Sequence, residues 1–252
     1  MPVRSELHPL VERFARVRHA AAARYGPGSQ AVSFLLYEEL ISVRTLLAAD
    51  RSSTSLRSRA EHLVPAIQRW FDSGGVQTPA QAFHRTVAAR PTVIEFDRAC
   101  FEHRYRGPLD DLGPRAVHLH GREHALAVLD IGASYLYAVD DAGALRVWPQ
   151  SFRLADLVFG WAPGRQDHRR VVHPMLVPER LRVRAAGELV VAGSPTCVSV
   201  VANLKSGHFR PPPDCAAEVR RAVVSALELP EPADVDVFTM PQPATADPIP
   251  EA

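Results

Sequence analysis

One short stretch of the chain, ANLKSGHFRPPP at residues 202–213, brings together side chains that could do chemistry. Lys205 is the only lysine among the 29 Lys and Arg residues, and Arg210 follows it closely. Together with the backbone N–H groups of the Ser-Gly turn between them, these two cations could hold an anion. His208 lies in the same turn, and an imidazole can transfer a proton near neutral pH. The pattern predicts an anion-binding loop with a group for acid or base catalysis.

The same stretch is also compatible with a structural role. Gly207 could simply make a turn, His208 could pack or cap, and the prolines at 211–213 could end a strand before Asp214 caps a helix. An open pocket beside His208 would favour catalysis, whereas a buried His208 without a cleft would favour the structural role.

Two segments of the sequence resemble a known pair. AGELVV at 186–191 and KSGHFRP at 205–211 are similar to a glycine-rich "AGE" strand and an "SGHYRP" signature of plant IQ-motif calmodulin-binding proteins and of bacterial proteins of toxin or effector type. HPML at 173–176 stands where that family has a His-Ser-Ser stretch. The residues that match directly are Gly187, Glu188, Ser206, Gly207, His208, Arg210 and Pro211.

The chain departs from this pattern at several positions. Phe209 replaces the usual tyrosine and so removes a hydroxyl group, and Pro174 and Met175 replace the two serines. Ile67-Gln68 is the only Ile-Gln pair and lacks the Arg-Gly of an IQ motif. The resemblance covers only the C-terminal part of the chain and implies a shared globular domain, not calmodulin binding.

From the residue types and the resemblance we expect an intracellular bacterial effector-type catalytic domain that acts on an anionic or nucleotide-like substrate. The expected substrate-binding residues are Lys205, Ser206, Gly207 and Arg210. We expect His208 to act as acid or base and Glu188 to orient His208 or to serve as its partner. The alternative from another class is a non-catalytic module in which this loop docks a partner protein.

A second cluster allows a metal site. His118, His120 and His124 occur in HLHGREH, and histidines at i and i+2 of a strand point to one face. The stretch from 113 to 132 resembles the first cupin motif, but the acidic residue follows the histidines too closely and no second motif is clear. A cupin-like metal-binding protein is therefore a further alternative, and no particular cofactor is indicated.

Composition excludes some classes of partner. The net charge of the 252 residues is +1, so no overall field favours nucleic acid or a membrane surface. No apolar run approaches the length of about 18 residues that a membrane span needs. The cysteines Cys100, Cys197 and Cys215 are odd in number and form no C-x-x-C pair. These features predict a cytoplasmic protein, and the preference for arginine indicates a GC-rich bacterial genome.

The patterning predicts an α+β fold with three parts. Apolar residues at three- and four-residue spacing predict three helices within residues 1–75, forming a helical subdomain. Short Val- and Tyr-rich runs predict a mainly antiparallel β domain over 76–240, covered by an amphipathic helix at 214–227. Residues 241–252 are rich in proline and are predicted to be a disordered tail.

The strand predictions are more detailed. AVHLHG, HALAVLD, SYLYAVD and ALRVWP are expected to form a meander between 116 and 149. LRVRA, ELVVAG and TCVSVVANL are expected as strands, with a hairpin turn at AGSP, and VDVFTM as a final strand. RGPLDDLGP is expected as a loop.

Overall fold

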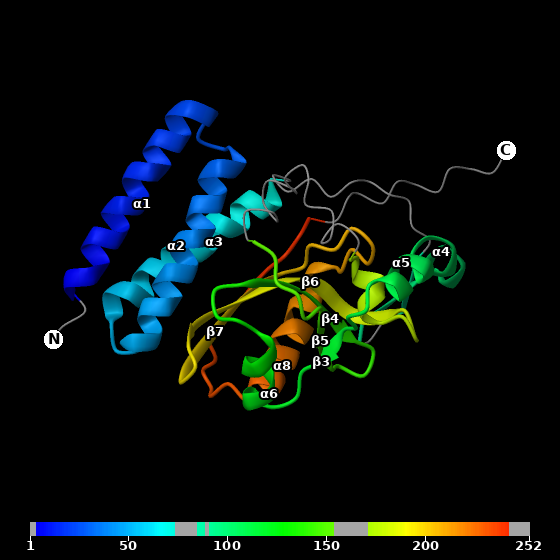
Figure 1. The fold of residues 1–252 in the computed structure, drawn as a ribbon. Helices are drawn as coiled ribbons and strands as arrows, with labels where there is room; N and C mark the ends of the chain where they lie inside the picture. The colour runs from blue at the N-terminus through cyan, green and yellow to red at the C-terminus, as the bar shows by residue number, and fades with distance from the viewer. Residues whose placement is uncertain (1–3, 74–84, 89–90, 154–170, 242–252) are drawn as a thin grey trace.

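Three long helices precede a sheet, and a further helix lies near the C-terminal end, in the computed structural model of the chain (Figure 1). The structure describes residues 4–73, 85–88, 91–153 and 171–241. The helices are α1 (Arg4–Tyr25), α2 (Gln30–Ala49) and α3 (Thr54–Asp72). The predicted α+β class is therefore confirmed.

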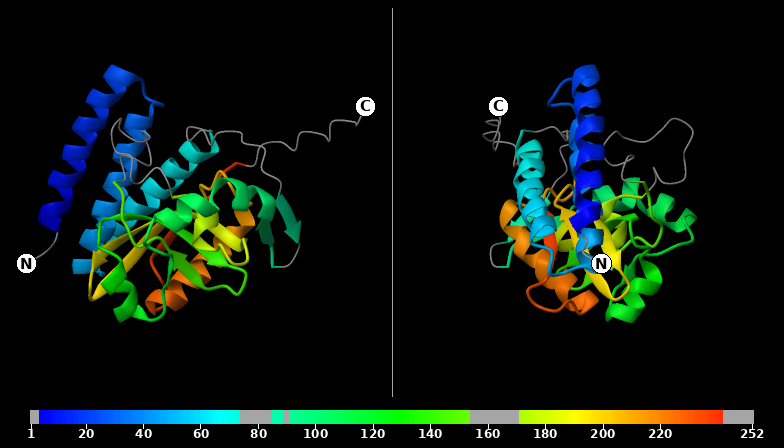
Figure 2. Two further views of the ribbon diagram at one scale, coloured as in Figure 1. Left: turned by 45° about the vertical axis from the view of Figure 1, so that its right-hand side comes forward. Right: turned by 90° about the vertical axis from the view of Figure 1, so that its left-hand side faces the viewer.

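The three helices are joined by an apolar face and by one buried ion cluster. In α3, Leu56, Ala60, Leu63 and Ile67 recur at three- or four-residue spacing and are all buried. Glu39 of α2 is completely buried and accepts hydrogen bonds from Arg18 of α1 and Arg59 of α3. In Figure 2, α1 is the outermost of the three, beside α2.

Within the described ranges the sheet has eight strands, and four short α-helices and two 3-10 helices lie between them. The strands are β1 (Arg85–Ala88), β2 (Val93–Phe96), β3 (Val117–His118), β4 (Ser134–Asp140), β5 (Leu145–Val147), β6 (Arg182–Ser194), β7 (Cys197–Asn203) and β8 (Val235–Phe238). The α-helices are α4 (Arg98–Arg104), α5 (Arg106–Asp111), α6 (Arg122–Val128) and α8 (Ala216–Leu227), and the main 3-10 helix is η2 (His173–Leu176).

The long strand β6 organises the sheet. The strand order is β1-β2-β6-β4-β5-β3, and β7 pairs with both β6 and β8. Along one edge, β6 pairs with β4. On its other edge it pairs with β2 at residues 182–183 and with β7 at residues 189–194, so residues 184–188 lie between two partners. Strand pairing along this second edge is thus interrupted at the centre of β6, whereas the pairing with β4 continues there.

Two hydrophobic clusters meet along β6. One hydrophobic cluster joins α2 and α3 to β6, β7 and α8. A second cluster includes Ala186 of β6 and Ala138 of β4 and is completed by Phe101, Met175 and Phe209 from α4, η2 and the loop after β7. The interrupted part of β6 is at the border between these two clusters.

Most of the expected strands are present, and several details are wrong. HALAVLD forms α6, because Ala125 and Leu129 are both buried at i,i+4 spacing and Ala and Leu favour helix. Within RGPLDDLGP, residues 106–111 form the short helix α5. LRVRA and ELVVAG are one strand, β6. The predicted final strand in VDVFTM is present as β8, and it runs parallel to β7.

The C-terminal elements agree with those predicted from the sequence, with one exception. The hairpin turn at AGSP joins β6 to β7 as predicted. The helix predicted at 214–227 is α8 with a preceding 3-10 turn, and no side chain caps its N-terminus, so the capping role expected of Asp214 is wrong. Of the predicted tail, all but Pro241 lies outside the described residues. No helix in the described ranges is long and apolar enough to cross a membrane.

Candidate functional site

Four polar side chains meet where the pairing of β6 is interrupted. They are Glu188 of β6, Asn203 at the end of β7, Lys205 in the loop that follows, and His173 at the start of η2. We call these four residues the β6 corner. Glu188, Asn203 and His173 are all buried, with exposed fractions of 6%, 4% and 6%. A cluster of this polarity inside a core needs mutual hydrogen bonds to be stable.

Gly187 allows the two strands to approach closely at this point. A Cβ atom at Gly187 would lie 1.9 Å from the backbone oxygen of Asn203, a distance that no real side chain tolerates. The glycine of the AGELVV segment is therefore required by the close approach of β7 and not by a turn.

Asn203 holds the corner together through its side-chain amide. Its Oδ1 accepts hydrogen bonds from the backbone N–H groups of Glu188 and Lys205, at 3.1 and 3.0 Å. Its Nδ2 donates to Oε2 of Glu188 at 2.9 Å. One amide thus fixes the carboxylate and the start of the loop together.

Glu188 and Lys205 form an ion pair. The Nζ atom of Lys205 lies 3.8 Å from Oε1 of Glu188, and the two side chains are 20% and 8% exposed. Burial raises the pKa of Glu188 above its ordinary value, while the charge of Lys205 and the hydrogen bond from Asn203 oppose that rise. A carboxyl group with a raised pKa is suited to exchanging a proton near neutral pH.

His173 is held as a neutral imidazole. Its Nε2 donates to the backbone oxygen of Gly187 at 3.0 Å, because a carbonyl oxygen can only accept. This leaves Nδ1 without a proton in the neutral ring. Burial, with a smaller contribution from the charge of Lys205, lowers the pKa of His173 to about 4.

The loop after β7 is tightly folded. Ser206 is 3% exposed, and its Oγ accepts a hydrogen bond from the N–H of Phe209 at 3.2 Å. The N–H of Arg210 donates to the Ser206 backbone oxygen at 2.8 Å. Arg210 has a φ of 46°, a left-handed conformation that is uncommon for a residue with a side chain. Such strain is found preferentially at functional sites.

His208 contacts another part of the chain. Its Nε2 is 3.1 Å from the hydroxyl of Tyr105, and its ring packs on Phe96 with centroids 5.9 Å apart. Burial lowers the pKa of His208 to about 3, and the nearby His173 contributes to that shift. His208 is therefore neutral at pH 7 and is a weak base.

Two tyrosines approach the corner from elements far away in the sequence. Tyr37 of α2 is hydrogen-bonded to the side chain of Asn203, and burial raises its pKa. The hydroxyl of Tyr137 in β4 donates to the backbone oxygen of Asn203 at 2.8 Å. Asn203 is thus contacted by α2, β4 and β6.

The structure brings together only part of the predicted site. Glu188 and Lys205 are in contact, and Ser206, Gly207 and Arg210 belong to the same loop. Glu188 contacts Lys205 and Asn203, and His208 contacts Tyr105 and Phe96. A direct contact between Glu188 and His208 stays a prediction.

Sequence reasoning missed Asn203, Tyr37 and Tyr137 as members of the site. The signal for Asn203 is present in the hairpin, because a turn that pairs Ser194 with Cys197 also sets residue 188 opposite residue 203. No comparable signal exists for Tyr37, which reaches the corner only through tertiary packing.

The histidines proposed as an alternative metal site do lie together. The rings of His120 and His124 are stacked with centroids 4.0 Å apart, and His118 is 5.8 Å from His120. However, Nδ1 of His124 accepts from the backbone N–H of His120. Among the described residues, no group of three or more His, Cys, Asp or Glu side chains is arranged to hold a metal ion.

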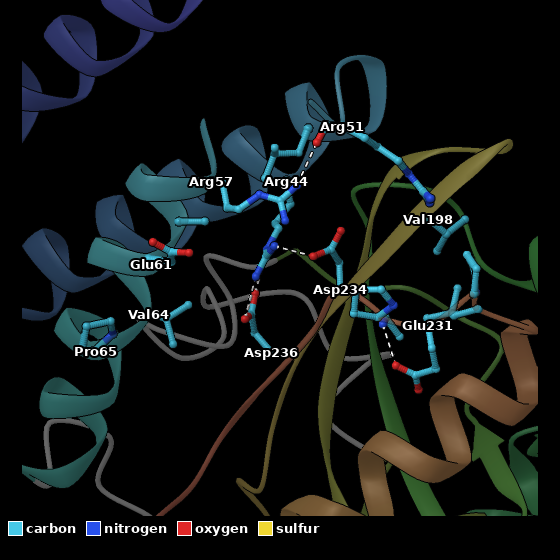
Figure 3. A pocket seen from close by; sticks show the side chains of 16 residues that line it. Arg44, Arg51, Arg57, Glu61, Val64, Pro65, Val198, Glu231, Asp234 and Asp236 are labelled. Carbon is cyan, nitrogen blue, oxygen red and sulfur yellow. Dashed lines mark hydrogen bonds and ion pairs between the residues drawn. The ribbon is translucent and has the colours of Figure 1, made fainter. Parts of the chain in front are cut away.

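A cavity lined by described residues lies between the helices α2 and α3 and the edge strand β8 (Figure 3). It has a volume of about 550 Å³ and is bordered by α2, α3, Val198 and the segment from Leu229 to Asp236. Arg44 crosses it and binds Asp234 and Asp236 at 2.8 to 2.9 Å. The guanidinium of Arg44 is thus held by two carboxylates, and none of the four residues of the β6 corner lines this cavity.

No protein-family model matches the chain, and no similar protein is found among curated proteins or solved structures. Its function is therefore inferred from its own residues and their geometry.

Proposed function

We propose that the β6 corner is the catalytic site of an effector-type domain that acts on a small anionic or nucleotide-like substrate by acid–base chemistry. The observation that carries this proposal is the pair of the buried Glu188 and the partly exposed Lys205, 3.8 Å apart, with Asn203 bonded to the carboxylate of Glu188 and to the backbone N–H of Lys205. Lys205 and Arg210 supply positive charge, and Ser206 and Gly207 shape the loop that presents it. The composition supports a cytoplasmic, bacterial protein.

Within this site, Glu188 is better suited to proton transfer than His208. Burial moves the two pKa values in opposite directions, raising that of Glu188 and lowering that of His208 to about 3. A base with so low a pKa is rarely protonated at pH 7, so the neutral ring of His208 serves as a hydrogen-bonding group. Glu188 then moves the proton, and Lys205 binds the anion.

This function is tested by incubating wild type and variants with a mixture of anionic metabolites and comparing which metabolites each protein consumes. Mass spectrometry follows the mixture with wild type, with Glu188→Gln, and with the control Glu218→Gln, which alters a half-buried carboxylate paired with Arg184. We expect wild type and control to consume the same metabolite, and Glu188→Gln to do so at least about 100-fold more slowly. Consumption at an equal rate by Glu188→Gln would contradict the proposal, as would consumption of no metabolite by wild type.

The second candidate, a non-catalytic module, is favoured by one observation. Phe209 is completely buried, Ser206 is 3% exposed, and His208 contacts Tyr105. His208→Ala separates the two functions, because a non-catalytic module predicts a loss of stability in this variant and no consumption of any metabolite by either protein. A fall in activity per folded molecule would favour catalysis.

A further inference from the structure

The ion pair between Glu188 and Lys205 has a consequence for any anion that binds beside Lys205. Oε1 of Glu188 lies 3.8 Å from the Nζ atom. An incoming anion must use the same ammonium group, so the ionised carboxylate and the anion would then face each other across one positive charge. Repulsion between two negative charges about 6 Å apart, at an effective dielectric constant of about 20, weakens binding about 100-fold.

Protonation of Glu188 removes this repulsion, and the β6 corner can accommodate the protonated carboxyl group. The side chain is 8% exposed, and burial reduces the cost of its neutral form relative to its charged form. The Oε2 atom keeps its hydrogen bond from Asn203 in either state, since a protonated carboxyl group still accepts. Lys205, at 20% exposed, is the more accessible member of the pair.

The histidines and tyrosines around Glu188 are neutral at pH 7. From η2 and the loop, His173 and His208 have pKa values lowered to about 4 and about 3. From α2 and β4, burial raises the pKa values of Tyr37 and Tyr137, which keeps both hydroxyls protonated. From β8, the charge of Asp236 is held by Arg44. Glu188 is therefore the group best placed to respond to an anion.

We propose that the β6 corner binds an anion and a proton together, with the anion at Lys205 and the proton on the carboxyl group of Glu188. The proton comes from solvent, and no covalent bond of the anion changes. This inference rests on the proposed function, because it requires the anion to bind at Lys205. It also gives that function an order of events: Glu188 becomes an acid when the substrate arrives, ready to donate its proton.

Calorimetric titration with sulfate tests the coupling, since sulfate does not itself titrate between pH 5.5 and 8. Measurements in buffers of different ionisation enthalpy give the number of protons taken up. We expect wild type and the control Glu218→Gln to take up as much as one proton, and their affinity to fall as the pH rises through this range, by at most about tenfold per pH unit, the limit for one coupled proton. Glu188→Gln should bind sulfate without proton uptake and with an affinity that does not depend on pH.

The possible failures are distinguishable. If Lys205→Met binds sulfate as well as wild type does, or wild type shows no saturable binding at any pH, the anion site is wrong and the proposed function fails with it. If binding requires Lys205 but wild type takes up no proton, only the coupling is overturned. The coupling is also overturned if Glu188→Gln still takes up a proton, because a histidine would then be the acceptor.

Discussion

Replacement of Gly187 by alanine should both destabilise the fold and disrupt the β6 corner. The added Cβ would lie 1.9 Å from the backbone oxygen and 2.8 Å from the backbone carbon of Asn203. The two backbones must therefore separate by about 1.5 Å to reach an ordinary contact distance. Such a shift strains the hydrogen bonds of Asn203 with Tyr137 and Glu188, which are 2.8 and 2.9 Å long.

The expected loss follows from these contacts. Overpacking a core costs about 1–3 kcal/mol, and leaving a buried hydrogen-bonding group without its partner costs about 1–3 kcal/mol. We expect Gly187→Ala to lower the free energy of unfolding by about 3–5 kcal/mol in urea titrations. The matched control is Gly107→Ala in α5, where a Cβ meets nothing within 4 Å, and this variant should be unchanged or more stable by up to about 1 kcal/mol. A loss below about 0.5 kcal/mol for Gly187→Ala would refute the close approach of β6 and β7.

Three other predictions concern stability. Glu39→Ala leaves two arginines without their buried partner and should cost about 3–5 kcal/mol in chemical unfolding, whereas Glu61→Ala on the exposed side of α3 should cost less than about 0.5 kcal/mol. The pKa of His173 is lowered to about 4 in the folded chain, so below about pH 6.5 the unfolded chain binds more protons than the folded chain does. Between pH 7 and pH 5 the free energy of unfolding of wild type should therefore fall by about 2 kcal/mol more than that of His173→Gln. Arg210→Gly relieves a left-handed backbone and should keep or increase the thermal midpoint, while a clear decrease would show that the arginine side chain outweighs the strain.

The helices and the strand-rich half could be predicted because their signals are local. Leu56, Leu63 and Ile67 mark the buried face of α3 at helical spacing, and the AGSP turn marks the hairpin of β6 and β7. The helix α6 was missed because its apolar residues also fit a short strand when only their composition is considered. The interrupted pairing of β6 could not be predicted, since it depends on how β2 and β7 share one edge.

The sequence identifies residues of the candidate site but not the contacts that they make in the fold. Lys205 and Glu188 were recognised from their residue types and from the AGE and SGH segments, and the structure places them in contact. The neutral state of His173 and the role of Asn203 depend on burial and on hydrogen bonds that no spacing reveals. Tyr37 comes from a helix more than 150 residues earlier in the sequence, so its contact with Asn203 follows from tertiary packing alone.

The most direct test of an anion site at the β6 corner is the position of selenate in crystals, located by the anomalous scattering of selenium. We expect selenate within hydrogen-bonding distance of Nζ of Lys205 in wild type, with its occupancy increasing as the pH is lowered, and we expect this peak to be absent from Lys205→Met. Selenate that binds only at other surface arginines, or that occupies the same position in both proteins, would show that the pair of Glu188 and Lys205 is a structural ion pair and not a binding site.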